Sequence, residues 1–179
     1  MGLQPGWYQR IYELLDLRSF SNLWYWLAVA VVWSSASHFV VGVPYDMVLR
    51  ARRRGGQAES DLDSLAQIHA NRIVSAEESA GAWIVGVMSF WLTVLGLLGF
   101  HYGIEFAQAV FLIVAPLTPV GYVTLRSART IAGQSLGGVA LQRQIARTRL
   151  AIQVIGFFAL FVTALWGMYQ NLLLGGLRG

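Results

Sequence analysis

The chain has 179 residues, of which 56% are hydrophobic and only 12% are charged, and its formal net charge is +4. Soluble domains average about a quarter charged residues, so this composition excludes an ordinary soluble domain and indicates a polytopic membrane protein that forms one domain over residues 1–179. Cysteine is absent, which excludes disulfides, thiolate metal sites and a thiol nucleophile.

Residues 5–18 form the first expected element. Trp7, Ile11 and Leu15 recur every four residues, whereas the charged side chains fall largely on the other side. This pattern predicts an amphipathic helix that is too short to span a bilayer and lies in the interface plane. Two roles stay open for it, a cap on the helical bundle or a docking element for a partner. Because no cleavable signal pattern precedes the first apolar run, we expect that run to act as an uncleaved anchor.

Four apolar stretches of roughly bilayer length follow. We place the transmembrane helices at about residues 23–43, 80–100, 104–122 and 151–174. The link between the second and third spans is very short, so these two spans are expected to be antiparallel neighbours. The sequence therefore predicts an all-α membrane protein with four transmembrane helices, the third of which contains Pro116 and Pro119.

Two polar segments, residues 44–79 and 125–149, follow the first and third spans, and each contains five arginines. The link between the second and third spans contains none. The positive-inside rule therefore predicts that both segments are cytoplasmic, with both termini on the periplasmic side of a bacterial inner membrane. Within the first segment we expect a helix to begin near Ser60 and to continue into the second span, protruding from the membrane.

The two arginine-rich segments align without gaps after a shift of 77 residues. Nine of the 30 positions from 43 to 72 are identical, where ordinary residue usage gives about two. The identities include Tyr45 with Tyr122, Arg52 with Arg129, and Gly56-Gln57 with Gly133-Gln134. This predicts a 2+2 parallel internal repeat, each unit being a span, a cytoplasmic elbow and a second span. The alternative is that two membrane-proximal segments share a composition.

Ionisable side chains are scarce inside the predicted spans. Between their ends these spans hold no Asp, Glu, Lys or Arg, which argues against a pump or an ion-coupled transporter. His38, near the cytoplasmic end of the first span, is a weak candidate for a haem ligand or a quinone hydrogen bond. The alternative is a histidine bonded across helices to small polar neighbours. No metal-ligand cluster, phosphate loop or nucleophile–base set is present in the sequence, so we expect no cofactor, no metal and no enzymatic activity.

Contacts with lipid or with a partner are predicted at three groups of residues. The first group attracts anionic headgroups or only sets the topology, and it comprises Arg50, Arg52, Arg53 and Arg54. Trp24 and Trp26 belong to an aromatic belt at the outer interface. Ala82 and Gly86 have the small-x-x-x-small spacing that lets a second helix approach closely, with chance as the alternative.

Four stretches carry a resemblance to a family. They are Asp16–Trp26, Trp33–Phe39, Gly42–Arg53 and Phe161–Asn171. These stretches resemble a family of alphaproteobacterial membrane proteins that are often labelled components of the Suf iron–sulfur assembly complex. The resemblance covers most of the chain and implies an inner-membrane location in that bacterial group. It brings no catalytic or binding motif with it.

Together these features predict a non-catalytic accessory subunit of a larger bacterial inner-membrane complex, respiratory or photosynthetic. Its expected partners are other membrane protein subunits and phospholipids. Nucleic acid is not expected, because the arginines lie beside the apolar runs. The main alternative is the small membrane subunit of a transporter, and a redox protein that uses His38 is a more distant one.

Overall fold

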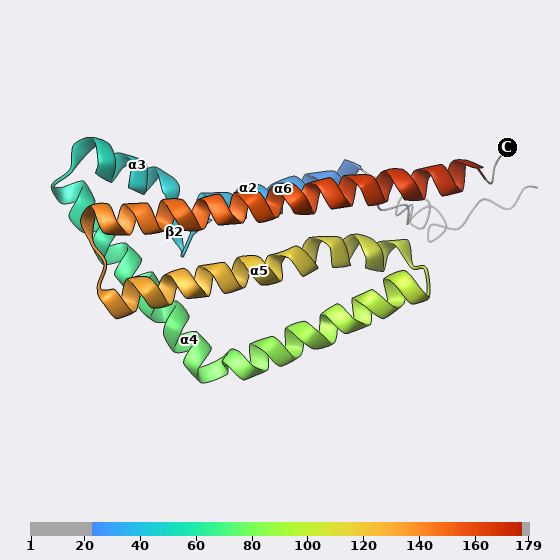
Figure 1. The fold of residues 1–179 in the computed structure, drawn as a ribbon, viewed down its shortest axis with the longest axis horizontal. Coiled ribbons are helices and arrows are strands. Elements are labelled where there is room, and N and C mark those ends of the chain that lie inside the picture. Colours follow the sequence, from blue (N-terminus) through green and yellow to red (C-terminus); the bar gives the residue numbers. More distant parts are fainter. Residues whose placement is uncertain (1–22, 177–179) are drawn as a thin grey trace, which may run out of the picture.

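The structure, a computed structural model, describes residues 23–176, so the predicted interfacial helix at residues 5–18 lies outside the described part of the chain. The described residues are mostly helical (Figure 1). The α-helices are α2 (Leu23–His38), α3 (Tyr45–Arg54), α4 (Gln57–Gly96), α5 (Glu105–Gln134) and α6 (Gly138–Gly176). A short π-helix, η2 (Leu97–His101), continues α4, and two short strands, β1 (Phe39–Val40) and β2 (Val43–Pro44), separate α2 from α3.

Among the described residues, three helical stretches are long and apolar enough to cross a membrane, Gln57–His101, Glu105–Gln134 and Gly138–Leu172. The first contains the predicted span at 80–100, and the other two cover nearly all of the predicted spans at 104–122 and 151–174. The apolar part of α4 and α5 run antiparallel, as the short link predicts (Figure 1). All three stretches are longer than the predicted spans, because each helix continues without a break into an arginine-rich segment.

The predicted first span at 23–43 is wrong at its C-terminal end. α2 stops at His38, and the next six residues form an antiparallel hairpin in which Val40 pairs with Val43. The hairpin is rich in β-branched residues and contains Gly42 and Pro44, which favour a strand and a turn over a helix. The 16 residues of α2 cover about 24 Å, somewhat less than the hydrocarbon thickness of a bilayer.

The hairpin turn holds two residues at positive φ. Val41 has φ +54° and Gly42 has φ +76°, as a two-residue turn of type I′ requires. A β-branched residue rarely adopts positive φ. Val41 does so with a side chain that is only 1% exposed, so its burial in the core offsets the backbone strain.

α4 is one helix from Gln57 to Gly96, which confirms that a helix of the first arginine-rich segment continues into the second span; it begins three residues before Ser60. Its ribbon changes direction near its middle (Figure 1). There, the Ser79 hydroxyl donates a hydrogen bond to the backbone carbonyl of Ser75. Such bonds from serine to the preceding turn compete with the backbone ladder and often bend helices.

The main hydrophobic core lies at the polar end of the molecule. It is built by the hairpin, α3, the first half of α4, the last turns of α5 and the first turns of α6, which we call the head region (Figure 1). Its fully buried members include Val40, Val48, Leu62, Ile131, Leu141 and Ile145. The apolar halves of α4, α5 and α6 extend from the head region, and many of their large side chains are exposed in the single chain.

The two predicted repeat units agree in one feature and differ in another. The turn at Gly55-Gly56 corresponds, after the shift of 77 residues, to positions 132–133, which lie just before the end of α5 at Gln134. The hairpin at 39–44 corresponds to positions 116–121, which are continuous helix in α5. The internal repeat therefore stays a prediction.

Candidate functional site

Arg149 of α6 joins three elements at the level where α2 ends. Its guanidinium carbon lies 3.8 Å from the centre of the Tyr45 ring, a cation–π arrangement with the first residue of α3. Its Nε donates a hydrogen bond of 3.2 Å to the backbone carbonyl of Ser37, in the last turn of α2. A cation is favoured there because the last carbonyls of a helix carry partial negative charge. Arg149 thus fixes the end of α2 against the head region.

Polar contacts between the long helices lie at a similar level. The Arg129 guanidinium of α5 forms a 2.8 Å ion pair with Glu77 of α4. Between α5 and α6, the Ser127 hydroxyl accepts hydrogen bonds from Thr148 at 2.8 Å and from Gln144 at 3.2 Å. Ser127 and Thr148 are buried, so their hydroxyls need these partners. These contacts hold the helices together where the arginine-rich segments begin.

The predicted contact arginines all lie on α3, an amphipathic helix that buries Val48 and Ala51 against the head region. Arg50, Arg53 and Arg54 line an open hollow of about 290 Å³ together with Asp46 and Leu49, and we call this the α3 hollow. Arg52 is exposed but does not line it. The structure therefore brings together three of the four predicted arginines.

The predicted small-residue pair lies on the exposed side of α4. Ala82 and Gly86 are exposed, and a Cβ placed on Gly86 would meet no atom within 4 Å. They belong to a longer row of small exposed residues, spaced alternately three and four positions apart, which we call the small-residue stripe: Ser79, Ala82, Gly86, Ser89 and Thr93. The Thr93 hydroxyl bonds to the Ser89 carbonyl of its own helix at 2.8 Å.

The remaining predicted residues lie apart from these surfaces. His38 ends α2, is exposed, and packs edge-to-face on the ring of Phe39 at a centroid distance of 4.8 Å. The described residues contain no group of three or more metal-ligating side chains, around His38 or elsewhere. Trp24 is 76% exposed in the first turn of α2, and Trp26 is partly buried there, with its ring 5.4 Å from that of Tyr25.

At the end of the molecule opposite the head region, a buried side-chain amide connects neighbouring helices. Gln108 of α5 is 4% exposed, and its Nε2 donates to the Gly99 carbonyl of η2 at 2.8 Å. Its Oε1 accepts hydrogen bonds from Trp166 at 3.0 Å and from Gln170 at 2.7 Å, both on α6. Gly99 permits this approach, since a Cβ there would lie 2.9 Å from the backbone nitrogen of Gln108. Gln108 thus connects α5, α6 and the π-helix.

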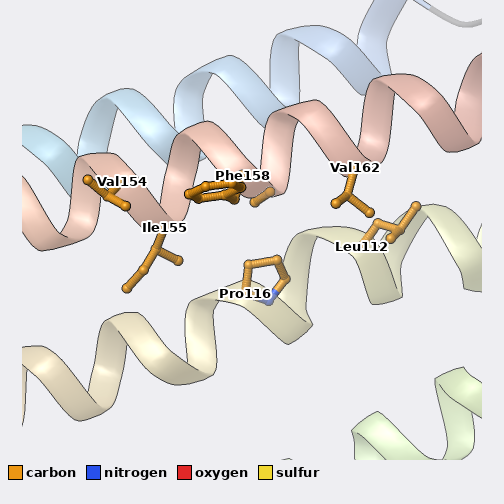
Figure 2. A pocket seen from close by; sticks show the side chains of 7 residues that line it. Leu112, Pro116, Val154, Ile155, Phe158 and Val162 are labelled. Carbon is orange, nitrogen blue, oxygen red and sulfur yellow. The ribbon is translucent and has the colours of Figure 1, made fainter.

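An apolar groove of about 360 Å³ runs between α5 and α6 (Figure 2). Pro116 of α5 faces Phe158 of α6 across it, and Leu112 and Val162 lie further along (Figure 2). All of its lining side chains are apolar. Its side chains suit a hydrocarbon chain or apolar side chains, and they offer no groups that would orient a polar substrate.

Gln108, Arg149, Ser127 and Thr148 were not among the predicted site residues. Glutamine, serine and threonine are not ionisable, so a search for charges inside the spans passes over them. Arg149 carries a signal in the sequence, since it begins an apolar run, but this signal also fits a purely topological role. No protein-family model, no curated protein and no solved structure matches the chain.

Proposed function

We propose that this protein is a non-catalytic accessory subunit of a larger bacterial inner-membrane complex and that it binds its partner through the apolar half of α4. In this proposal α2 is the fourth membrane helix, beside the three stretches that are long enough to span. The head region is cytoplasmic and both termini are periplasmic, because the arginines gather around the head region. A respiratory or photosynthetic complex is the proposed host.

The exposure of the apolar half of α4 carries this proposal. Only 6% of the most apolar stretch of this helix is buried within the chain, whereas 22% is buried in α5 and 28% in α6. Large side chains such as Trp83, Phe90 and Trp91 are more than half exposed there. A helix that is firmly anchored in the head region at one end, yet barely covered in the membrane, has surface to offer to another subunit.

The small-residue stripe favours a protein helix over lipid as the cover of α4. Lipid tails are as apolar as leucine, so helices associate in membranes through close packing, which small residues permit. The spacing of three and four positions keeps all five members of the stripe on one face over several turns. The hydroxyls of Ser79 and Thr93 bond within α4, so packing against the stripe leaves them satisfied.

The alternative, the small membrane subunit of a transporter, needs a path for its substrate between the helices. The groove between α5 and α6 is lined by apolar side chains only. The buried polar groups of Gln108, Ser127 and Thr148 bond to neighbouring helices of the same chain. These observations favour a subunit that binds other proteins.

Purification of the tagged full-length chain from its native membranes in mild detergent tests the proposal. We expect the wild-type chain to be recovered with larger membrane partners, and Gly86→Leu to reduce their recovery at least tenfold. The matched control is Gly121→Leu on α5, because Gly121 is also exposed and a Cβ there also meets no atom within 4 Å. Recovery of the wild-type chain as a lone monomer, or equal losses in both variants, would refute the proposal.

A further inference from the structure

The α3 hollow gathers three cations around one anion. Arg50, Arg53 and Arg54 line it, and Asp46 lies opposite Arg50 at 3.6 Å. Among the described residues, Arg53 and Arg54 pair with no carboxylate. The hollow therefore has an excess of two positive charges and room for a small anionic group. Guanidinium groups bind phosphate oxygens in a forked geometry, which makes phosphate a suitable occupant.

The direction of α3 orients these arginines. α3 begins at Tyr45, beside the end of α2, and runs toward the Gly55-Gly56 turn at the tip of the molecule (Figure 1). Side chains on a helix lean toward its N-terminus, so the arginines of α3 lean back toward the end of α2. The Arg50–Asp46 ion pair follows this direction, because Arg50 reaches one turn back along the helix.

The place of α3 favours a lipid headgroup over a soluble anion. In the proposed topology α2 ends at the cytoplasmic face of the membrane, and Arg149 marks the same level through Ser37 and Tyr45. Headgroup regions add about 5 to 8 Å on each side of the hydrocarbon core. The rise along α3 from Tyr45 to Arg50 is of about the same length, which places Arg50 at the depth of the headgroups. Leu49 is 39% exposed within the hollow and adds an apolar contact beside the charges.

We propose that the α3 hollow binds the phosphate of an anionic phospholipid, with Arg50, Arg53 and Arg54 as its ligands. Val48 and Ala51 hold the other face of α3 in the core, so the three guanidinium groups are presented by a fixed helix. The site rests on the proposed membrane orientation of the chain and is independent of the partner that covers α4. It selects lipids by charge, because its excess of cations favours a phosphate without a compensating amine.

Native mass spectrometry of the full-length, delipidated chain in detergent tests this site. The probe is an equal mixture of phosphatidylglycerol and phosphatidylcholine with identical acyl chains. We expect the wild-type chain to retain phosphatidylglycerol about tenfold over phosphatidylcholine, because the excess of positive charge in the α3 hollow favours the lipid that carries a net negative charge. The triple variant R50Q/R53Q/R54Q is expected to lose this preference. Its melting temperature should stay close to the wild-type value, because all three side chains are exposed.

The control variant R52Q/R143Q/R147Q removes the same charge from exposed arginines that do not line the hollow. It should keep at least half of the preference for phosphatidylglycerol. Equal loss in the two triple variants would overturn the site, since the preference would then follow net charge alone. Displacement of the lipid by millimolar glycerol phosphate would overturn the lipid assignment in favour of a soluble phosphate. Loss of the co-purifying partner in R50Q/R53Q/R54Q, without a lipid preference in the wild type, would instead identify a protein contact.

Discussion

The Asp63 carboxylate of α4 accepts a hydrogen bond from the backbone N–H of Gly138 at the start of α6, and both carboxylate oxygens lie 3.0 Å from that nitrogen. The first N–H groups of a helix have no partner within it and carry partial positive charge, so a carboxylate there satisfies a donor and complements the helix dipole. Gly137 makes the approach possible, because a Cβ at that position would lie 2.8 Å from Asp63 Oδ2. Asp63 therefore caps a helix that begins 75 residues later in the chain.

Replacement of Asp63 tests this cap. We expect Asp63→Ala to lower the free energy of unfolding by about 1 kcal/mol, the usual contribution of a helix cap. Asp61→Ala is the matched control, because within residues 23–176 the Asp61 side chain accepts only an exposed hydrogen bond from Gln57 of its own helix. Its effect should stay within about 0.5 kcal/mol. Chemical unfolding in detergent, followed by circular dichroism, measures both, and equal effects would contradict a capping role.

Gln108 is expected to stabilise the end of the molecule opposite the head region. Gln108→Leu removes three hydrogen bonds between helices, and polar contacts of this kind contribute about 0.6 kcal/mol each in membrane proteins. We therefore expect a loss of about 2 kcal/mol. Gln153→Leu on the exposed side of α6 should change the stability little.

A double-mutant cycle separates the pairwise contribution of Gln108 and Trp166. Trp166→Phe keeps the aromatic contact with Phe100 but removes the Nε1–H donor. Its cost should be smaller in the Gln108→Leu background than in the wild type, because the part that comes from the lost hydrogen bond is then absent. Strict additivity of the two substitutions would show that the Trp166–Gln108 hydrogen bond contributes nothing to stability.

Two glycine substitutions, one in the hairpin turn and one in α5, are expected to change the stability of the protein in opposite directions. Gly42 has φ +76°, and a Cβ there would lie 2.8 Å from His69 Nδ1, so Gly42→Ala should destabilise the protein by about 2 kcal/mol. Gly121 lies within α5 and has open space around it. Gly121→Ala should stabilise the protein by up to about 1 kcal/mol, because alanine is the better helix former. Thermal unfolding of both variants measures the signs, and a neutral Gly42→Ala would argue against the turn geometry.

Hydrophobic runs and helix signals in the sequence predict the long helices well. The apolar stretches place the three long spans, and the partial stripe of Leu62, Leu65 and Ile68 predicts a helix that continues into the span at 80–100. The end of α2 is missed, because hydropathy alone does not distinguish a helix from a buried hairpin. The combination of Gly42, Pro44 and the flanking valines was a signal for the hairpin.

The candidate site is harder to predict, since it depends on contacts between distant parts of the chain. The core of the head region includes small residues such as Ala66 and Ala70, which do not stand out in a hydropathy profile. The pairing of Arg149 with Tyr45 joins residues whose facing positions follow only from the packed helices. Arg50, Arg53 and Arg54 were predicted as a charged group, but their common hollow depends on where Asp46 and Leu49 lie on α3.

The proposed topology makes a prediction that the absence of cysteine allows to be tested cleanly. Tyr102 lies in the link between η2 and α5 and is 70% exposed, whereas Arg53 is exposed on α3 in the head region. In intact cells with a permeable outer membrane, Tyr102→Cys should react with a membrane-impermeant thiol reagent. Arg53→Cys should react only after the inner membrane is permeabilised, because the positive-inside rule retains the arginine-rich segments in the cytoplasm. Labelling of Arg53→Cys in intact cells would reverse the orientation and remove the basis for a cytoplasmic lipid site on α3.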